Sequence, residues 1–226
     1  RYPEYVLERC KNYIVAGEGM TADLRLRSSQ EDIILANRDN VGWEEAELYA
    51  MTIPLSEELP RLGRLMTHGV AIECDDKSFV FTAESGVGKS THAFLWQKHL
   101  GEKRVKVING DKPILWFKDG DIYACGSPWS GKEHLDENVC VPLRGICLLK
   151  RLDHSKECHP HILRATKEET LDFLMHQIFI PRKQASQIKT LMMVEELYEK
   201  VPVYHLTVDM SREAVMVSSN ELLKQL

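Results

Sequence analysis

The sequence lacks the features that place a chain in a membrane or on nucleic acid. None of its apolar runs approaches the roughly 20 residues that a bilayer-spanning helix needs, and no secretion signal is recognised at its start. It contains no long basic run, and its formal net charge is −5. Nucleic acid and membranes are therefore not expected among its main partners.

Cysteines are few and show no paired spacing along the 226 residues. Several of the six lie inside apolar runs, as buried thiols do, and this favours a reducing compartment. Hydrophobic residues make up 43% of the chain and charged residues 28%, as in soluble globular proteins. We therefore expect a cytoplasmic protein with a well-formed core. The cysteines are Cys10, Cys74, Cys125, Cys140, Cys147 and Cys158.

Residues 79–96, FVFTAESGVGKSTHAFLW, combine a strand, a tight loop and the start of a helix. Phe79–Ala83 is apolar and of strand length, whereas the residues from Lys89 onward favour a helix. Backbone N–H groups in such a turn point into one concavity, and the helix dipole adds positive potential there. Gly86 and Gly88 permit positive φ and close approach of the backbone. The stretch therefore predicts a site for a polyphosphate.

The same loop indicates how a nucleotide would be held. In the pattern GxxxxGK(S/T) the lysine, here Lys89, reaches the β- and γ-phosphates, and the hydroxyl, here of Ser90, ligates Mg²⁺. Ala83 replaces the first glycine of the pattern, and an ordinary strand-to-helix turn with a surface lysine is the alternative. The predicted nucleotide-binding residues of the loop are Glu84, Ser85, Gly86, Val87, Gly88, Lys89, Ser90 and Thr91.

The first 66 residues carry no recognisable chemistry and predict a small β-rich N-terminal lobe. TADLRLR, residues 21–27, alternates in hydropathy, and Asp32–Ala36 is a second strand candidate. Glu44–Met51 favours a helix. We expect this lobe to precede a nucleotide-binding domain that spans residues 67–226.

The second domain predicts an α/β fold with a mixed, largely antiparallel sheet. Two hairpins are indicated, one turning at Asp75-Asp76-Lys77 and one at Asp119-Gly120. The second is the stronger signal, because Asp-Gly between apolar runs is typical of a hairpin turn. The helices gather late in the chain, where Thr166 and Glu169 form a capping box and Ser211 caps a terminal helix reaching Leu226. Further strands are expected at 105–108, 143–149 and 203–208, and a helix at 183–200.

Four segments, in this order, resemble bacterial HPr kinase/phosphorylase, whose fold is shared with phosphoenolpyruvate carboxykinase. They are His68-Gly69-Val70, AESGVGKS at 83–90, INGDKP at 108–113 and Leu143-Arg144-Gly145-Ile146. The resemblance covers about residues 67–150. It implies a phosphotransferase that uses ATP with Mg²⁺ or Mn²⁺ and, in the HPr kinases, a protein serine as acceptor. It also favours self-association.

By matching position, the resemblance assigns phosphate and metal binding to Lys89 and Ser90, with Asp111 facing them as metal ligand or proton acceptor. His68 matches a histidine near the transferred phosphate, where an imidazole could donate a hydrogen bond or relay a proton. The family carries two adjacent aspartates, whereas this chain has Gly110-Asp111. The alternatives are that Asp111 is a simple turn residue and that His68 lies at the surface or the edge of the core.

The segment GSPWSGKE, residues 126–133, has the make-up of a functional loop. Lys132 could meet a phosphate, and Glu133 could supply the missing carboxylate. A structural turn held by Trp129 is the alternative. Further along, Arg144 is either a phosphate clamp or a cation at the edge of a strand.

Two other groups are expected to be structural. A segment rich in histidine after residue 153 does not follow the spacing of a closed zinc site, so it predicts a polar loop. Apolar residues of the helix at 183–200 recur at helical spacing and predict a stripe that faces the core. The first group is His154, Cys158, His159 and His161; the second is Ile188, Leu191, Met192 and Leu197.

These observations lead to one functional hypothesis and one alternative. We expect an ATP-binding, Mg²⁺-dependent phosphotransferase whose acceptor is a hydroxyl of a protein or a small molecule, with Asp111, His68 and Glu133 as catalytic residues. The alternative is a module that senses a nucleotide, or serves as a scaffold, without transferring phosphate. The single aspartate at Gly110-Asp111 favours this alternative. A homo-oligomer is compatible with both.

Overall fold

The computed structural model describes residues 2–15, 19, 21–38 and 40–224, in which helices and strands alternate irregularly. The strands are β1 Arg64–Met66, β2 Val70–Cys74, β3 Lys77–Thr82, β4 Val105–Asn109, β5 Ile114–Lys118, β6 Asp121–Cys125, β7 Cys140–Arg151, β8 His161–Arg164 and β9 Val203–Val208. The α-helices are α1 Pro3–Cys10, α2 Gln30–Ala36, α3 Trp43–Ala50, α4 Thr52–Glu58, α5 Lys89–Leu100, α6 Lys167–Gln177, α7 Gln184–Lys200 and α8 Arg212–Leu223. Two short 3₁₀ helices are η1 Lys11–Tyr13 and η2 Leu59–Leu62.

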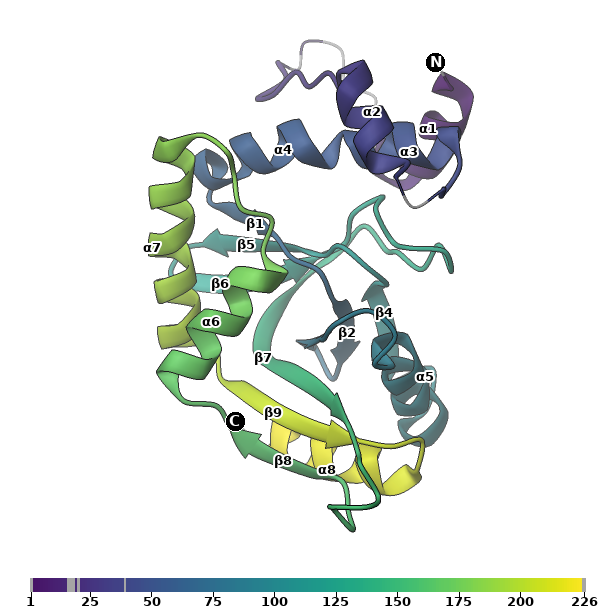
Figure 1. The fold of residues 1–226 in the computed structure, drawn as a ribbon, viewed down its shortest axis with the longest axis vertical. Helices are drawn as coiled ribbons and strands as arrows, with labels where there is room; N and C mark the ends of the chain where they lie inside the picture. The colour runs from purple at the N-terminus through teal and green to yellow at the C-terminus, as the bar shows by residue number, and fades with distance from the viewer. Residues whose placement is uncertain (1, 16–18, 20, 39, 225–226) are drawn as a thin grey trace.

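The described strands form one curled sheet with helices on both faces (Figure 1). Its order is β1-β5-β6-β7-β3-β2-β4, and β9 pairs with both β7 and β8. Among the described pairings only β3–β7 and β7–β9 are parallel. The expectation of a mixed, largely antiparallel sheet is confirmed.

Both predicted hairpins are present, with turns of the expected kind. The β2–β3 turn has positive φ at Asp75 and Asp76, and the β5–β6 turn has positive φ at Asp119 and Gly120. Positive φ at both central residues matches the twist of the paired strands. The capping box of Thr166 with Glu169 and the cap at Ser211 are also found, at the starts of α6 and α8. Leu226 lies outside the described residues.

The N-terminal region is helical where the sequence pattern predicted strands. Residues 21–27 pair with no described strand, and 32–36 belong to α2, which begins at a capping box between Ser29 and Asp32. Local hydrogen bonds at that cap therefore outweigh the apolar run that follows it. The alternation at Leu24 and Leu26 arises because both pack against a cluster that includes Trp129.

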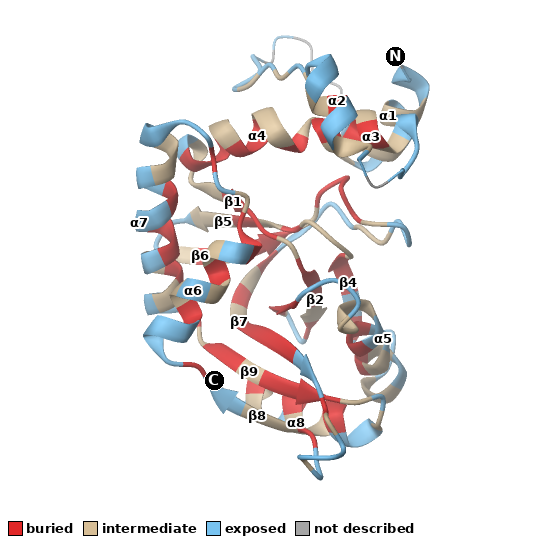
Figure 2. Ribbon diagram, in the orientation of Figure 1, coloured by how far each residue is buried: buried red, intermediate tan, exposed pale blue. Residues whose placement is uncertain are grey.

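Strand β3 lies at the centre of the core, and successive side chains supply its two faces (Figure 2). Val80 joins the cluster under α6 and α7, whereas Phe79 and Phe81 join the cluster under α5 and α8. Period-two alternation in a strand has this effect. Helix α5 is held on the second face by His92 and Trp96, whose rings lie 4.9 and 5.6 Å from that of Phe81.

Two expectations about buried side chains are wrong. Cys125 and Cys140 are directly opposite in β6 and β7 and form a disulfide. The cysteines therefore no longer indicate a reducing compartment. In α7, the side chains of Ile188, Leu191 and Met192 are exposed, whereas that of Leu197 is buried as expected. Helical spacing showed that the three share a face, but not which way that face points.

No described helix is long and apolar enough to cross a membrane.

Stability should fall in mild acid because of His92. Burial lowers the pKa of His92 from 6.5 to about 4, so between these values the unfolded chain binds a proton that the folded chain excludes. The free energy of unfolding should therefore decrease by about 3 kcal/mol from pH 6.5 to pH 4 on this account. His92→Phe should flatten that part of the profile, because it removes the imidazole that titrates there. The Trp96 Nε1 hydrogen bond to Ser218 Oγ at 3.0 Å does not involve His92 and should be kept in the variant. Urea unfolding across this pH range measures the effect; identical slopes for both proteins would contradict it.

Candidate functional site

A cleft of about 1430 Å³ lies between the N-terminal helices and three loops that follow β3, β4 and β6. It exceeds the roughly 300–1,000 Å³ of a usual small-molecule pocket, so it has room for two ligands side by side. From the loops it is lined by Ser85, Gly86, Gly88, Lys89, Ser90, Thr91, Gly110, Asp111, Lys112, Gly131, Lys132, Glu133 and His134. From the N-terminal side it is lined by, among others, Trp43, Glu44, Glu45 and Tyr49, and His68 lies on its wall.

The loop between β3 and α5 leaves donors open toward this cleft. Gly86 and Gly88 have φ of 81° and 116°, as their predicted role in the turn requires. The backbone N–H groups of Gly88, Lys89 and Ser90 donate to no described residue, as at the first turn of any helix. Lys89 Nζ folds back on the loop and donates to the carbonyls of Ala83 at 3.0 Å and Glu84 at 3.3 Å. The loop thus presents several N–H donors and an ammonium to the cleft.

Arg151 braces this loop from the neighbouring strand. Strand β7 runs parallel to β3, with Leu148 opposite Thr82, so its last residue extends past the end of β3. There Arg151 Nη2 donates to the carbonyl of Gly86 at 2.7 Å. This contact has no local signal in the sequence, because it depends on which strand neighbours β3.

Asp111 is the carboxylate at the inner end of the cleft, and three side chains surround it. Lys112 Nζ lies 2.5 Å and the Tyr49 hydroxyl 3.0 Å from Oδ2, and His68 Nε2 lies 3.4 Å from Oδ1. The Asn109 side-chain oxygen accepts from the backbone N–H groups of Asp111 at 2.9 Å and Lys112 at 2.7 Å. This Asx-type turn fixes the chain at the end of β4. Tyr49 and Lys112 were not identified from the sequence.

Burial and charge shift the pKa values at this end of the cleft. Burial lowers the pKa of His68, and the Lys89 ammonium lowers it further, although Asp111 opposes both. Burial also lowers the pKa of Lys89, again opposed by Asp111. Burial and the Asp111 carboxylate raise the pKa of Tyr49. These shifts favour the uncharged forms of His68 and Tyr49 beside Asp111.

The 126–133 loop is both a structural turn and part of the cleft. Trp129 is buried and its Nε1 donates to the carbonyl of Leu48 at 2.8 Å, while the Gly131 N–H donates to the Tyr49 hydroxyl at 3.1 Å. A Cβ added at Gly131 would lie 3.2 Å from Asp111 Cβ and 3.7 Å from Glu133 Oε2. Asp111 and Glu133 therefore both border the space beside Gly131, and the two alternatives for this loop are compatible.

Gly110 cannot carry the second carboxylate that the resemblance to the HPr kinases implies. A Cβ at this position would lie 2.6 Å from the backbone oxygen of Ser130, well inside van der Waals contact. The single aspartate is thus built into the packing of the 126–133 loop against the end of β4.

The structure brings most of the predicted residues together and separates three. Glu84 and Val87 do not line the cleft, and Val87 packs against the core. Arg144 lies toward the other end of the β3–β7 pair and binds Asp121 in β6 through two contacts of 2.8 Å. Its guanidinium is therefore paired with Asp121 and does not line the cleft. Of the histidine-rich segment, His161 begins β8 and His159 lies 3.3 Å from Glu213.

No protein-family model and no curated protein matches this chain. Among solved structures, the HPr(Ser) kinase/phosphatase from Coxiella burnetii is similar, with a TM-score of 0.39 and 13% sequence identity over 70% of this chain and 91% of that one. This is a weak, fold-level similarity, and it carries no inference about activity.

Replacing Gly110 should cost stability whatever side chain is introduced. Gly110→Ala and Gly110→Asp both place a Cβ against the Ser130 carbonyl, and each should lower the free energy of unfolding by about 1–3 kcal/mol. Because the Cβ causes the clash, the two variants should lose similar amounts in urea unfolding. A Gly110→Asp protein as stable as the unsubstituted chain would contradict this explanation.

Proposed function

We propose that this protein binds ATP with Mg²⁺ in the cleft and transfers the terminal phosphoryl group to a hydroxyl acceptor. The observation that carries the proposal is the convergence of open backbone donors, the Lys89 ammonium and the Asp111 carboxylate on one cavity. Phosphoryl transfer needs little covalent chemistry from the protein. It needs positioned positive charge and a group that accepts the proton of the attacking hydroxyl.

The loop after β3 would hold the phosphates. The N–H groups of Gly88, Lys89 and Ser90 would donate to phosphate oxygens, and the dipole of α5 adds to their attraction. Lys89 would exchange its two carbonyl partners for a charged one, and charge-assisted hydrogen bonds are about twice as strong as neutral ones. The contact from Arg151 would keep Gly86 in place as this exchange occurs.

The donor set fits a magnesium ion that is shared with a nucleotide. No group of three or more His, Cys, Asp or Glu in the described ranges is arranged to hold a metal alone. Mg²⁺ is usually bound by one or two carboxylates together with waters and phosphate oxygens, and Ser90 and Asp111 both line the cleft. These two side chains would hold the ion, which when bound neutralises charge on the phosphates.

Asp111 would also accept the proton of the acceptor hydroxyl. Its Oδ2 is held by Lys112 and Tyr49, which leaves Oδ1 turned toward His68. A neutral His68 could donate a hydrogen bond to a phosphate oxygen. Glu133, which borders the same space as Asp111, would supply the second negative charge that Gly110 cannot.

One observation favours a module that binds a nucleotide without transferring phosphate. The Lys112 ammonium lies 2.5 Å from Asp111, so the carboxylate is already paired in the free protein. This ion pair occupies Oδ2 of the carboxylate that the transfer reaction would use. The two functions differ in turnover and not in binding, so separate experiments address them.

Lys89→Ala should weaken ATP binding. Loss of charge-assisted contacts worth about 1.5–3 kcal/mol corresponds to affinity lower by about one to two orders of magnitude. Lys98→Ala is the matched control, because Lys98 is an exposed lysine of the same helix outside the cleft. Calorimetric titration with ATP and Mg²⁺ measures both variants. Unchanged affinity in Lys89→Ala would refute the binding site.

Asp111→Asn should abolish transfer and, because Asp111 would also ligate Mg²⁺, reduce the Mg²⁺ dependence of ATP binding, whereas the contacts of the loop after β3 with ATP remain. Removal of a proton acceptor costs about 10²–10⁴ in rate, measured as transfer of labelled terminal phosphate to the components of a cell extract. Asp119→Asn, in the exposed β5–β6 turn where Asn also tolerates positive φ, should transfer normally. If the unsubstituted protein binds ATP but labels nothing, the non-transferring module is the correct function.

A further inference from the structure

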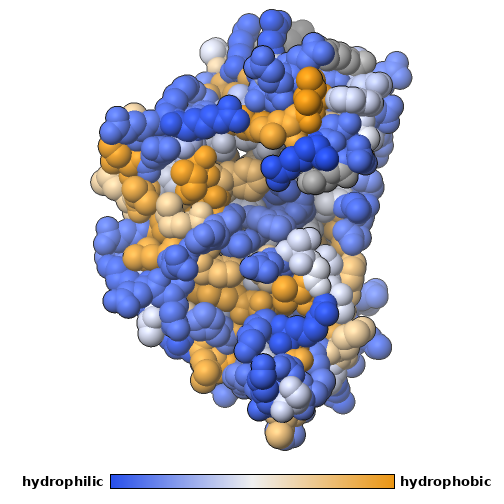
Figure 3. Space-filling view, in the orientation of Figure 1, coloured by the Kyte–Doolittle hydropathy of each residue, from blue (hydrophilic) through white to orange (hydrophobic). Residues whose placement is uncertain are grey.

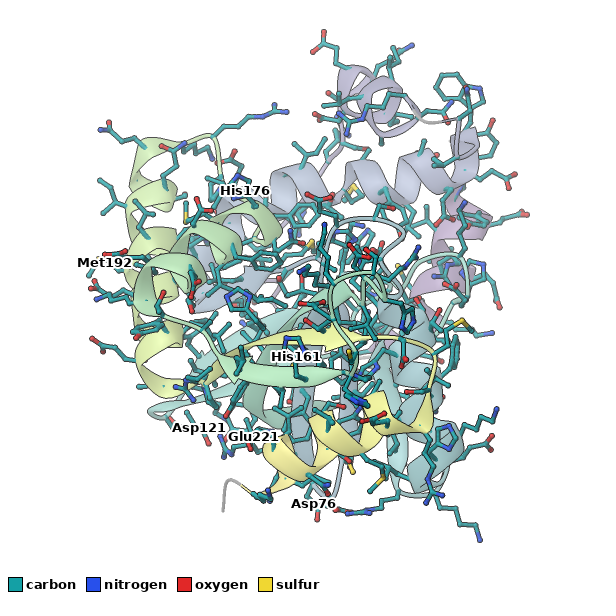
Figure 4. The ribbon with its side chains drawn as sticks, turned by 60° about the horizontal axis from the view of Figure 1, so that its bottom comes forward. Asp76, Asp121, His161, His176, Met192 and Glu221 are labelled. Carbon is teal, nitrogen blue, oxygen red and sulfur yellow. A yellow bond between two sulfur atoms is a disulfide. The ribbon has the colours of Figure 1, made fainter. Side chains whose placement is uncertain are left out.

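Helix α7 has an exposed apolar stripe on the side away from the sheet. Ile188, Leu191 and Met192 retain 54%, 51% and 67% of their exposure, and spacings of three and four residues place them on one face. The opposite face of the helix, with Met193 and Leu197, is buried in the core. Figure 2 shows this division along the helix, and Figure 4 shows Met192 directed away from the body. A helix that is apolar on both sides is typical of one covered by a partner.

Charges flank the stripe with opposite signs at its two ends. Arg182, just before the helix, and Glu199, near its end, are exposed and form no ion pair with any described residue. Between them, exposed Lys189 lies in the first half of the helix and exposed Glu195 in the second. Exposed Lys183 and Lys200 pair with Glu58 and Glu196, and Glu195 pairs with Lys167. The charges without such a partner among the described residues are therefore basic before the apolar stripe and acidic after it, and Figure 3 shows apolar side chains at the edge of the molecule where α7 runs.

We propose that α7 is a homodimer interface, in which two copies of this chain pair their α7 helices antiparallel about a two-fold axis. An axis beside residues 190 and 191, midway between Arg182 and Glu199, sets each of these two charges opposite the other in the second copy. The midpoint between Ile188 and Met192 falls at residue 190, half a residue from this axis, so these side chains lie near each other across the interface, with Leu191 beside its centre. The charged ends and the apolar centre thus favour registers that agree to within half a residue.

Self-complementarity selects the second copy as occupant and the antiparallel orientation. A two-fold interface joins the same patch on both subunits, so each contact occurs twice. In a parallel pairing Arg182 would face Arg182 and Glu199 would face Glu199, which is repulsive. None of the residues that line the cleft belongs to α7, so pairing leaves the cleft open and is independent of the proposed catalysis.

Analytical ultracentrifugation of the full chain, from micromolar to near-millimolar concentration, tests the interface. The unsubstituted protein should dimerise, and the double variant Leu191→Glu with Met192→Glu should remain monomeric. Met210→Glu is the matched control, because Met210 is 77% exposed between β9 and α8 and should not affect the dimer. A monomer at every concentration, or a double variant that dimerises like the unsubstituted chain, would overturn the proposal.

Exchanging the charges at Arg182 and Glu199 tests the register of the dimer. Unlike glutamates placed in the apolar stripe, these substitutions put no new charge into the centre of the interface. Arg182→Glu alone and Glu199→Arg alone should each weaken the dimer several-fold, because both copies lose an ion pair and gain a repulsion. The protein that carries both substitutions should regain the original dissociation constant. Failure of the double exchange to restore dimerisation would exclude the antiparallel register. Circular dichroism confirms that each variant is folded.

Discussion

Burial of β3 on both of its faces determines where the loop that follows it lies. Its side chains supply both core clusters, so the strand can neither slip nor turn over without exposing one of them. Parallel pairing with β7 and antiparallel pairing with β2 fix its end at Thr82. The chain must then reverse within a few residues to enter α5, whose own packing against Phe81 fixes the other side of the loop. The position of the loop is therefore a consequence of the core.

A second feature joins parts of the chain that are far apart in sequence. Tyr49 belongs to the N-terminal helices, yet its hydroxyl donates to Asp111 after β4 and accepts from Gly131 after β6. The N-terminal helices thus form one wall of the cleft and also order its inner end. This contact explains why the 126–133 loop serves two purposes, since Trp129 anchors it to Leu48 while Glu133 faces the cleft.

Features with local signals could be predicted from the sequence. The Asp119-Gly120 turn, the capping box at Thr166 and the strand, loop and helix around Gly86 and Gly88 all follow from residues adjacent in the chain. Contacts set by the fold could not be predicted. Tyr49 is 62 residues from Asp111, and Arg151 is 65 residues from Gly86. The exclusion of a side chain at position 110 depends on the packing of the 126–133 loop against Gly110. The outward direction of the α7 stripe depends on which face of the helix packs on the core.

In the proposed function, the amides after β3 and Asp111 face the two ends of one polyphosphate. A crystal structure of the protein with Mg²⁺ and a non-hydrolysable ATP analogue tests it most directly. We expect phosphate oxygens within hydrogen-bonding distance of the N–H groups of Gly88 and Lys89, with Lys89 Nζ released from the carbonyl of Ala83. We also expect the terminal phosphate on the side of Asp111. A nucleotide bound elsewhere, or one whose phosphates point away from this loop, would contradict it.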